Sequence, residues 1–283
     1  MTPHVLIVGG TKGSWQVRGI QIGRAIGARV ATAPTAEDWA WADCCILVKR
    51  ALGQYAAIAQ AHGVPIIWDA LDFWRQPEEN GLSIADAIAL AHAQITQCGV
   101  DLVIGATEAM ADDLGGVALA HHSRPRLVTG PVREQLSVVA YEGTPKYLGS
   151  WRSAVEAACA RLGATFVVNP PDLRDADVIV AFRGEQWDGA LCRRWKSGVK
   201  CVNALAAGRP LITQPSAAGT EIAPPGVTID DPACVEDALA AFRSLDARLA
   251  VAQTCAARAG EYQITSLARR YRSVVETLLR RAA

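Results

Sequence analysis

The chain has 283 residues and a mass of 30.0 kDa, which suits two modest domains because domains commonly contain roughly 100–200 residues. Hydrophobic residues make up 51% and charged residues 20%, a composition that excludes disordered and fibrous proteins. The 28 Lys and Arg residues balance the 28 Asp and Glu residues. This neutrality argues against a protein that coats nucleic acid, because such proteins neutralise phosphates with an excess of cations.

The opening MTPHVLIVGG is typical of a first strand and lacks the pattern of a signal peptide. No apolar run approaches the ~20 residues that span a bilayer. The eight cysteines form no CxxC pair, and no HxxxH pair accompanies them, so a structural zinc site is not favoured. Scattered cysteines in apolar surroundings indicate buried thiols in a reducing cytoplasm. We therefore expect a cytoplasmic protein.

Short apolar runs alternate with helical patterns through the first half of the chain. The predicted helices lie near 14–27, 51–62 and 83–97, and the predicted strands are 4–9, 28–33, 44–49, 64–69 and 101–106. Continuous Val, Ile and Leu runs separated by helices indicate a parallel sheet that is covered on both faces.

A glycine-rich loop, GGTKGS at 9–14, follows the first strand. Its backbone N–H groups and the helix start after it favour an anion or a sugar hydroxyl, although a tight turn without a ligand is the alternative. The segment does not match the phosphate-binding loop G-x-x-x-x-G-K-[ST]. The second strand ends without the acid that holds the ribose of NAD, which disfavours dinucleotide binding. Trp15 and Arg18 begin the next helix, where they either face the cleft or are packing or surface residues.

Two carboxylates, Asp69 and Asp72, stand among aromatic residues in WDALDFW (68–74). An acid among large apolar rings can have a raised pKa and act as a proton donor or acceptor, whereas an Asp at a strand end commonly caps the next turn. Lys49 and Arg50 follow the third strand and either face the same opening or are solvated.

The regular alternation stops at HHSRPRLVTGPVRE (121–134), which is rich in Pro, Gly and cations and predicts a linker. His122 in this segment is either a ligand contact or an exposed residue, and no Ser/His/Asp spacing supports a hydrolase triad. A second alternation follows, with helices near 149–162 and within 184–207 and with strands at 136–141, 164–169, 177–182, 210–213 and 227–229. Two α/β halves joined in this way would place a cleft between their carboxyl strand ends.

The segment from 177 to 222 carries most of the functional signal. Arg183 follows a buried strand, and a helix is predicted from near Ser197 to Gly208. Its free N–H groups, together with Lys196 and Lys200, would hold a diphosphate. A second small-residue loop, SAAGTEI at 216–222, carries Glu221.

The pattern K-x-x-N-A-L-A-A-G-R-P-L-I from Lys200, followed by G-T-E-I at 219–222, resembles the donor-binding helix of GT-B glycosyltransferases of the bacterial nucleotide-sugar-dependent family 4/1 type. The glycine-rich GSWQVRG (13–19) and WDALDFW extend the resemblance to the first half. It implies an α/β fold of two Rossmann-like domains that face each other across a cleft, with a C-terminal helix that crosses back. The implied parts are an acceptor-side domain (1–132), a nucleotide-sugar-binding domain (133–262) and a crossover helix (263–283).

The resemblance also implies the site residues. Arg183 and Lys200 would contact phosphate and Glu221 the ribose or the donor sugar, and the full implied donor set is Gly13, Arg183, Lys200, Asn203, Glu221, Gly143 and Thr144. The candidate acceptor-side residues are Trp15, Arg18 and His122. Asn203 stands where many retaining members have the first Glu of an E-x7-E motif, so the stereochemistry stays open. Asp69 or Asp72 is the candidate base if transfer inverts configuration.

No metal or cofactor is expected. Asp175-Ala-Asp177 has the D-x-D spelling with which some glycosyltransferases hold a metal, but it directly precedes a strand and is interpreted as a loop and cap. The final segment, 265–283, is an amphipathic helix that carries Arg269, Arg270, Arg272, Arg280 and Arg281. Such a helix has a solvated face or rests on an anionic membrane, so peripheral contact with the inner membrane face is an alternative to a purely cytoplasmic location.

The function expected from these residues is metal-independent transfer of a hexose-type sugar from a nucleoside diphosphate donor to a hydroxyl acceptor. The nucleotide sugar is a co-substrate, and the acceptor is a glycan, a lipid-linked molecule or a small molecule. DNA is disfavoured by the neutral charge. The alternatives are a non-catalytic nucleotide-sugar-binding or interaction module of the same fold and, less favoured, a Rossmann-type NAD(P) oxidoreductase.

Overall fold

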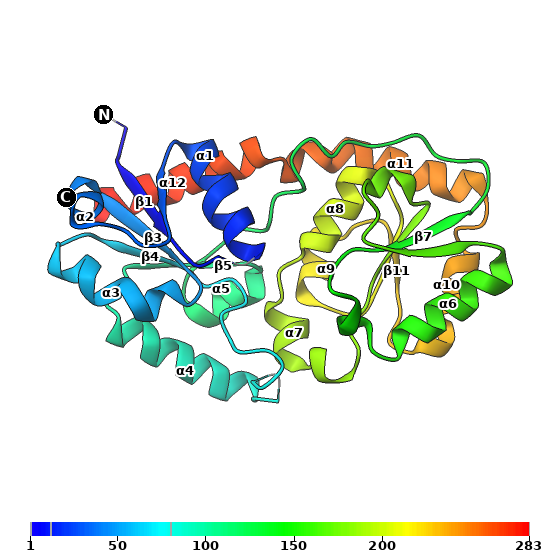
Figure 1. Cartoon of the computed structure of the whole chain (residues 1–283), viewed down its shortest axis with the longest axis horizontal. Helices are drawn as coiled ribbons and strands as arrows, with labels where there is room; N and C mark the ends of the chain where they lie inside the picture. Colours follow the sequence, from blue (N-terminus) through cyan, green and yellow to red (C-terminus); the bar gives the residue numbers. More distant parts are fainter. Residues whose placement is uncertain (1, 12, 80, 283) are drawn as a thin grey trace.

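The computed structural model describes residues 2–11, 13–79 and 81–282 and places two α/β halves side by side (Figure 1). The N-terminal half contains a parallel sheet in the order β2-β1-β3-β4-β5-β6. Its strands are β1 (Val5–Val8), β2 (Arg29–Ala31), β3 (Cys44–Val48), β4 (Ile66–Asp69), β5 (Leu102–Gly105) and β6 (Val117–Ala118). Strands β1, β3 and β4 are buried along their whole length, as the continuous apolar runs predict.

Helices cover both faces of this sheet, so two apolar cores form, one on each face. The helices are η1 (Trp15–Gln21, π-helical), α1 (Ile22–Ile26), α2 (Ala36–Trp41), α3 (Ala51–Ala61), α4 (Ile84–Gln97) and α5 (Glu108–Leu114). Thr35, Ser83 and Thr107 begin three of them, because each side chain accepts a hydrogen bond from the backbone N–H group three residues later.

The C-terminal half contains a second parallel sheet, in the order β11-β10-β9-β7-β8. Its strands are β7 (Val138–Tyr141), β8 (Thr165–Val168), β9 (Val178–Ala181), β10 (Leu211–Thr213) and β11 (Gly226–Thr228). Its α-helices are α6 (Trp151–Leu162), α7 (Ala190–Trp195), α8 (Val199–Ala207), α9 (Ala217–Ile222), α10 (Val235–Ala240) and α11 (Leu245–Arg258). Short 3-10 turns are η2 (Pro145–Leu148), η3 (Leu173–Asp175), η4 (Glu185–Trp187), η5 (Pro232–Cys234) and η6 (Ala259–Tyr262).

The last helix, α12 (Ile264–Ala282), returns to the N-terminal half and packs on α1 (Figure 1). Its apolar face is buried in one of the N-terminal cores through Leu267, Tyr271, Val275 and Leu278. The predicted pair of Rossmann-like units with a crossover helix is therefore confirmed. The apolar face that an interfacial helix would insert into lipid is covered by protein in this structure. Within the described residues, no helix combines the length and the apolar character needed to cross a bilayer.

A buried polar network attaches α12 to the N-terminal sheet. Tyr271 Oη donates a hydrogen bond to Asp69 Oδ2 (2.7 Å) and accepts one from Arg18 Nη1. The other terminal nitrogen of Arg18 donates to the carbonyl of Leu119, and Arg18 Nη1 lies 3.7 Å from Asp69 Oδ2. All three side chains of this network are almost fully buried. Burial raises the pKa of Tyr271 well above its ordinary value, so this phenol stays protonated as a donor.

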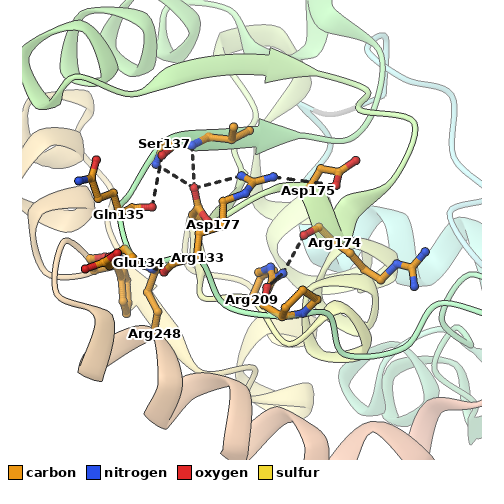
Figure 2. A network of polar contacts seen from close by, with 12 residues as sticks. Arg133, Glu134, Gln135, Ser137, Arg174, Asp175, Asp177, Arg209 and Arg248 are labelled. Atoms are coloured by element: carbon orange, nitrogen blue, oxygen red, sulfur yellow. Dashed lines mark hydrogen bonds and ion pairs between the residues drawn. The ribbon is translucent and has the colours of Figure 1, made fainter.

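Buried charges also hold the segment between the two halves in place, as Figure 2 shows. Arg209 donates to the carbonyls of Pro131 (2.8 Å) and Arg174 (2.7 Å), and Arg248 donates to those of Arg133 and Glu134. Asp177 accepts hydrogen bonds from the backbone N–H groups of Ser137 and Val138 at the start of β7, at 2.8 Å each. This is the capping position that the sequence predicts for the D-x-D segment.

The Arg18–Asp69–Tyr271 network generates a stability prediction. Tyr271→Phe removes the hydroxyl between two buried charged groups, so we expect the free energy of unfolding to fall by about 1–3 kcal/mol. Urea unfolding followed by tryptophan fluorescence measures this change. Tyr262→Phe is the matched control, because no described residue forms a hydrogen bond with that hydroxyl. Equal stability of the two variants would contradict the assignment.

Candidate functional site

The candidate site lies where the carboxyl strand ends of the two sheets face each other. In open α/β sheets, ligands bind at the point where the strand order reverses. In the N-terminal half this point lies between β1 and β3, and in the C-terminal half it lies between β7 and β9. One cavity lies at the switch point of the N-terminal half. In the C-terminal half a second cavity lies next to the ends of β9 and β10 and the start of α8, and Lys196 lines both cavities.

The first cavity, which we call the N-terminal cavity, has a volume of about 440 Å³. Its walls come mainly from the loop after β1 and from the ends of β3 and β4, and Tyr147 and Lys196 of the other half complete it. Among its lining residues are Ser14, Trp15, Lys49, Asp72, Trp74 and Lys196. The cavity therefore combines charged groups with aromatic walls.

The second cavity, which we call the C-terminal cavity, surrounds the start of α8. Its lining includes Arg183 after β9, Gln214 after β10 and Lys196, Gly198 and Lys200 around the helix start. No side chain caps α8, so its first N–H groups remain directed at the cavity. A Cβ atom on Gly198 would lie 2.3 Å from Cδ1 of Ile222 and 3.0 Å from Cβ of Ala218, so the start of α8 lies close against α9.

Lys200 is the most perturbed cation of the C-terminal cavity. Its ammonium lies over the ring of Tyr141, 4.2 Å from the centroid. Burial, together with the positive charges of Arg183 and Lys196, lowers its pKa from 10.5 to about 7. Within the described residues, no carboxylate or carbonyl accepts a hydrogen bond from its ammonium. An anion that entered the cavity would provide the missing partner.

Arg183 also has unused hydrogen-bonding capacity. Its backbone N–H donates to Gln214 Oε1 (2.6 Å), and its guanidinium lies 5.7 Å from the centroid of the Tyr147 ring. The buried Nη1 atom has no hydrogen-bond partner among the described residues. Because a buried charged donor is costly to leave unpaired, this atom indicates a place for an acceptor group of a ligand.

Asp72 lies between two lysines at the boundary of the two halves. Its carboxylate is 2.6 Å from the ammonium of Lys49 and accepts a hydrogen bond from Lys196 of the C-terminal half. Burial opposes the negative charge, but Lys196 and Lys49 outweigh it and hold the pKa of Asp72 well below its usual value. Asp72 is therefore ionised and engaged by two cations, which makes it a weak base.

The contact between the halves is largely apolar. Leu191, Cys192 and Trp195 of α7 are buried in a core of the N-terminal half. The Trp195 ring lies 5.7 Å from that of Phe73 and 6.2 Å from that of Trp74, measured between centroids. Asp113 of α5 accepts hydrogen bonds from the indole of Trp195 (2.6 Å) and from the guanidinium of the preceding residue, Arg194.

Several residues predicted for the site lie away from these two cavities. Asp69 and Arg18 belong to the buried network that attaches α12. Gly13 is exposed at the helix start, and Thr144 is exposed in the loop after β7. Gly143 in that loop exchanges two hydrogen bonds with the side chain of Asn169, at 2.7 and 2.9 Å.

Trp15 does line the N-terminal cavity, and its position explains two glycines of the loop and helix. A Cβ atom on Gly9 would lie 2.3 Å from the Trp15 indole, and one on Gly19 would lie 2.0 Å from it. These glycines therefore make room for a protein side chain, which fixes the indole as a wall of the cavity.

Asn203 and His122 line a third cavity of about 410 Å³ beside the start of the linker. Asn203 donates to Glu142 (2.8 Å) and accepts from the backbone N–H of Arg124 (2.8 Å), so its amide is already occupied by protein. The ring nitrogens of His122 lie 2.7 and 3.3 Å from the carbonyl oxygens of Ser123 and Val17. Burial lowers the pKa of His122, so this ring is neutral.

Glu221 is directed at the other half of the molecule. Its carboxylate accepts hydrogen bonds from the backbone N–H groups of Glu108 (2.8 Å) and Ala109 (3.2 Å) at the start of α5. An acid at a helix N-terminus is favoured by the free N–H groups and by the helix dipole. In this structure Glu221 therefore links α9 to α5, and it does not line the C-terminal cavity.

Structure brings Arg183 and Lys200 together and places Lys196 and Lys49, which the sequence also suggested, at the two cavities. It adds Tyr147 and Gln214, which were not among the residues suggested by the sequence. Gln214 directly follows a strand, and that position is the signal by which it could have been found. Tyr147 lies in the short turn η2, and its place in the cavity depends on the tertiary fold. Among the described residues, no group of three or more His, Cys, Asp or Glu side chains is arranged to hold a metal ion.

No protein-family model matches the sequence, and no curated protein matches it. Solved structures do match it. The spinosyn forosaminyltransferase SpnP aligns with a TM-score of 0.58 and 12% identity over 98% of this chain and 100% of its own. AviGT4, a glycosyltransferase involved in avilamycin A biosynthesis, aligns with a TM-score of 0.56 and 11% identity over 98% of each chain. The spinosyn rhamnosyltransferase SpnG, solved with thymidine diphosphate, aligns with a TM-score of 0.55 and 12% identity over 95% of this chain and 99% of its own. This chain has the GT-B fold of these enzymes, as the sequence resemblance predicted.

The lowered pKa of Lys200 generates a prediction about stability and pH. Between about pH 7 and pH 10.5 the unfolded chain keeps the proton that the folded protein has lost, so the contribution of Lys200 to stability rises with pH across this window. We expect Lys200→Met to stabilise the ligand-free protein most at or below about pH 7, and the gain should shrink as the pH rises. Thermal unfolding from pH 6 to pH 9 measures the difference in stability between the variant and the unmodified protein.

Lys146→Met is the matched control for this series, because Lys146 is an exposed lysine of the same half. The Lys146 variant keeps Lys200, so its stability should follow the same pH profile as that of the unmodified protein. Parallel pH profiles of the Lys200 and Lys146 variants would show that Lys200 does not lose its proton near neutral pH.

Proposed function

We propose that the protein transfers a sugar from a nucleoside diphosphate donor to a hydroxyl acceptor, and that the transfer needs no metal ion. The observation that carries the proposal is the set of unsatisfied positive groups in the C-terminal cavity. Arg183 has a buried nitrogen without a partner, Lys200 has no acceptor for its ammonium among the described residues, and α8 begins without a side-chain cap. A diphosphate would satisfy all three features.

The fold supports the same function. The neighbours SpnP and AviGT4 are glycosyltransferases by name, and SpnG was solved with thymidine diphosphate. In the proposed arrangement the diphosphate lies at the start of α8, and the nucleoside extends toward Gln214 and Ser216. The sugar is then directed toward Lys196, where the C-terminal cavity meets the N-terminal cavity.

The proposed chemistry rests on charge. Cleavage of the bond between sugar and phosphate builds positive charge on the anomeric carbon and negative charge on the leaving diphosphate. Groups placed in advance stabilise that negative charge without having to reorganise. Arg183, Lys200 and the N–H groups of α8 would do this, and a phosphate beside Lys200 would favour its protonated form. Lys200 would thus take up a proton when the donor binds.

We assign Asp72 a positioning role in this scheme. The carboxylate holds the ammonium groups of Lys196 and Lys49 at the boundary of the two cavities. Its low pKa makes it a weak proton acceptor, so an inverting transfer would require the acceptor hydroxyl to displace at least one lysine from it. Asp69 contacts Tyr271 in the protein interior and is less suited to the role of base.

One observation favours a second function, a non-catalytic module that binds a nucleotide sugar. Asn203, at the position where many retaining family members have a Glu, is hydrogen-bonded to Glu142 and Arg124. Its amide is therefore not free to contact a sugar in this structure. Release of nucleoside diphosphate from a bound donor distinguishes the two functions, because a binding module leaves the donor intact.

The proposal predicts selective binding of nucleoside diphosphates. Calorimetric titration with dTDP, UDP, GDP and ADP should reveal at least one ligand that binds far more tightly than its parent nucleoside. Lys200→Met should weaken this binding by about tenfold or more, since a hydrogen bond to a charged group contributes ~1.5–3 kcal/mol. Lys146→Met should leave it unchanged. Binding that persists in EDTA supports the metal-independent scheme, and a diphosphate affinity equal to that of the nucleoside overturns the proposal.

The same titrations predict a pH dependence. The free protein loses the Lys200 proton near pH 7, and the bound diphosphate favours the protonated form, so the affinity should fall as the pH rises above about 7. The Lys200→Met variant should lack this decrease. If the variant keeps the full pH dependence, another group is responsible for it.

A further inference from the structure

The N-terminal cavity has an excess of positive charge. Lys49, Arg50 and Lys196 line it, and Asp72 is the carboxylate among its lining residues. Asp72 is shared by the two lysines, whereas the guanidinium of the exposed Arg50 lies 3.5 Å from the carbonyl of Trp74. Within the described residues, no carboxylate forms an ion pair with Arg50. Three cations thus face one anion in a space that is separate from the proposed diphosphate position.

The backbone holds Lys49 in the cavity at an energetic cost. Lys49 has φ of 56°, in the left-handed region that non-glycine residues avoid. Its N–H donates to the carbonyl of Asp69 (2.8 Å), and its carbonyl accepts from the Trp68 indole (2.9 Å). Leu71, directly before Asp72, is also left-handed, with φ of 45°. Such conformations persist only where the surroundings enforce them, and they cluster at functional sites.

Aromatic rings form the rest of the wall. The indoles of Trp15 and Trp74 and the phenol of Tyr147 line the same cavity as the cations. The Trp15 indole is fixed by contact with the glycine-rich loop, and the ammonium of Lys196 lies 5.9 Å from the centroid of the Trp74 ring. Flat rings provide a surface for the apolar face of a sugar or for another ring. The cavity therefore suits a ring-bearing molecule that also carries negative charge.

We propose that the N-terminal cavity binds the acceptor and that this acceptor is a ring-bearing molecule with one carboxylate, such as an acidic sugar. This inference rests on the proposed function and adds the chemical class of the acceptor. A single negative charge is favoured over a phosphate dianion, because Lys196 also faces the diphosphate and Asp72 already neutralises part of the cluster. The carboxylate would contact Lys49 and Arg50, and the ring would lie along Trp15 or Trp74.

Matched sugars test the proposal directly. The 4-nitrophenyl β-glucuronide and the 4-nitrophenyl β-glucoside differ by a carboxylate in place of a CH₂OH group. Calorimetric titration of the full chain, with and without the nucleoside diphosphate that binds best, should show the glucuronide binding about tenfold or more tightly. The corresponding glucoside 6-phosphate should bind less tightly than the glucuronide.

Three variants test whether the preference for the glucuronide arises in the N-terminal cavity. Arg50→Met and Lys49→Asn should reduce the preference for the glucuronide to about threefold or less, and Asn is chosen because it tolerates the left-handed backbone. Arg24→Met, which removes an exposed arginine from α1, should keep the full preference. Nucleoside diphosphate affinity should stay within about twofold in the Arg50 and Arg24 variants, since neither residue lines the C-terminal cavity.

The outcomes separate this inference from the proposed function. If the unmodified chain binds no nucleoside diphosphate, the proposed function is overturned. The sugar titrations without nucleotide would still report on the N-terminal cavity. Equal affinity for the two sugars, absence of binding by both, or tighter binding of the 6-phosphate would overturn the carboxylate assignment. The Arg50 variant alters an exposed side chain and should fold. An unchanged preference for the glucuronide in this variant would show that the carboxylate does not bind beside Arg50.

Discussion

Burial of Trp195 in the aromatic cluster of the other half is the interaction on which the site depends. The indole contacts Phe73 and Trp74 and donates to Asp113, and burial of so large an aromatic side chain contributes roughly 3 kcal/mol or more. Lys196 is the next residue, so the same contact places its ammonium between the two cavities. The facing edges of the two sheets are thus fixed by an aromatic contact that has the ion pair of Arg194 and Asp113 beside it and Lys196 at its border with the cavities.

A cluster of cations in a half-buried cavity opposes folding, and the structure limits this cost in three ways. Lys196 and Lys49 share the carboxylate of Asp72. Lys200 lies over the face of Tyr141, and its lowered pKa reduces its charge near neutral pH. Arg183 keeps a nitrogen without a partner among the described residues, so part of the cost remains until an anion arrives. Sites that bind strongly commonly sacrifice stability in this manner, because the ligand completes what the protein leaves unsatisfied.

The sequence was sufficient for most of the architecture, because continuous apolar runs and helical spacing are local signals. Each predicted strand is present, with ends displaced by two residues or fewer, but the short helices α2 and α5 and the two-residue strand β6 were not predicted. The expectation of a loop at 216–222 was wrong, because Ala217–Ile222 form the helix α9 and Ser216 caps it. The site was harder to predict, since it depends on the direction in which each side chain points in the folded protein. Asp69 and Asp72 lie three residues apart, yet Asp69 faces Tyr271 of the distant α12 and Asp72 faces Lys196. Likewise, the carboxylate of Glu221 is engaged by α5, which no local pattern around Glu221 reveals.

The partners of each cation distinguish structural roles from binding roles. The buried guanidinium of Arg209, which lies inside the motif that suggested donor binding, donates to the carbonyls of Pro131 and Arg174, and Arg248 is similarly occupied. Arg193 lines the C-terminal cavity, but Asp188 and Asp230 engage it. Because the terminal nitrogens of these groups are already paired, an incoming anion would have to break existing contacts to use them, although the buried Nε atoms of Arg209 and Arg248 have no hydrogen-bond partner among the described residues. Arg183 and Lys200 need no such exchange, so the diphosphate is best placed by the cations that the fold leaves without partners.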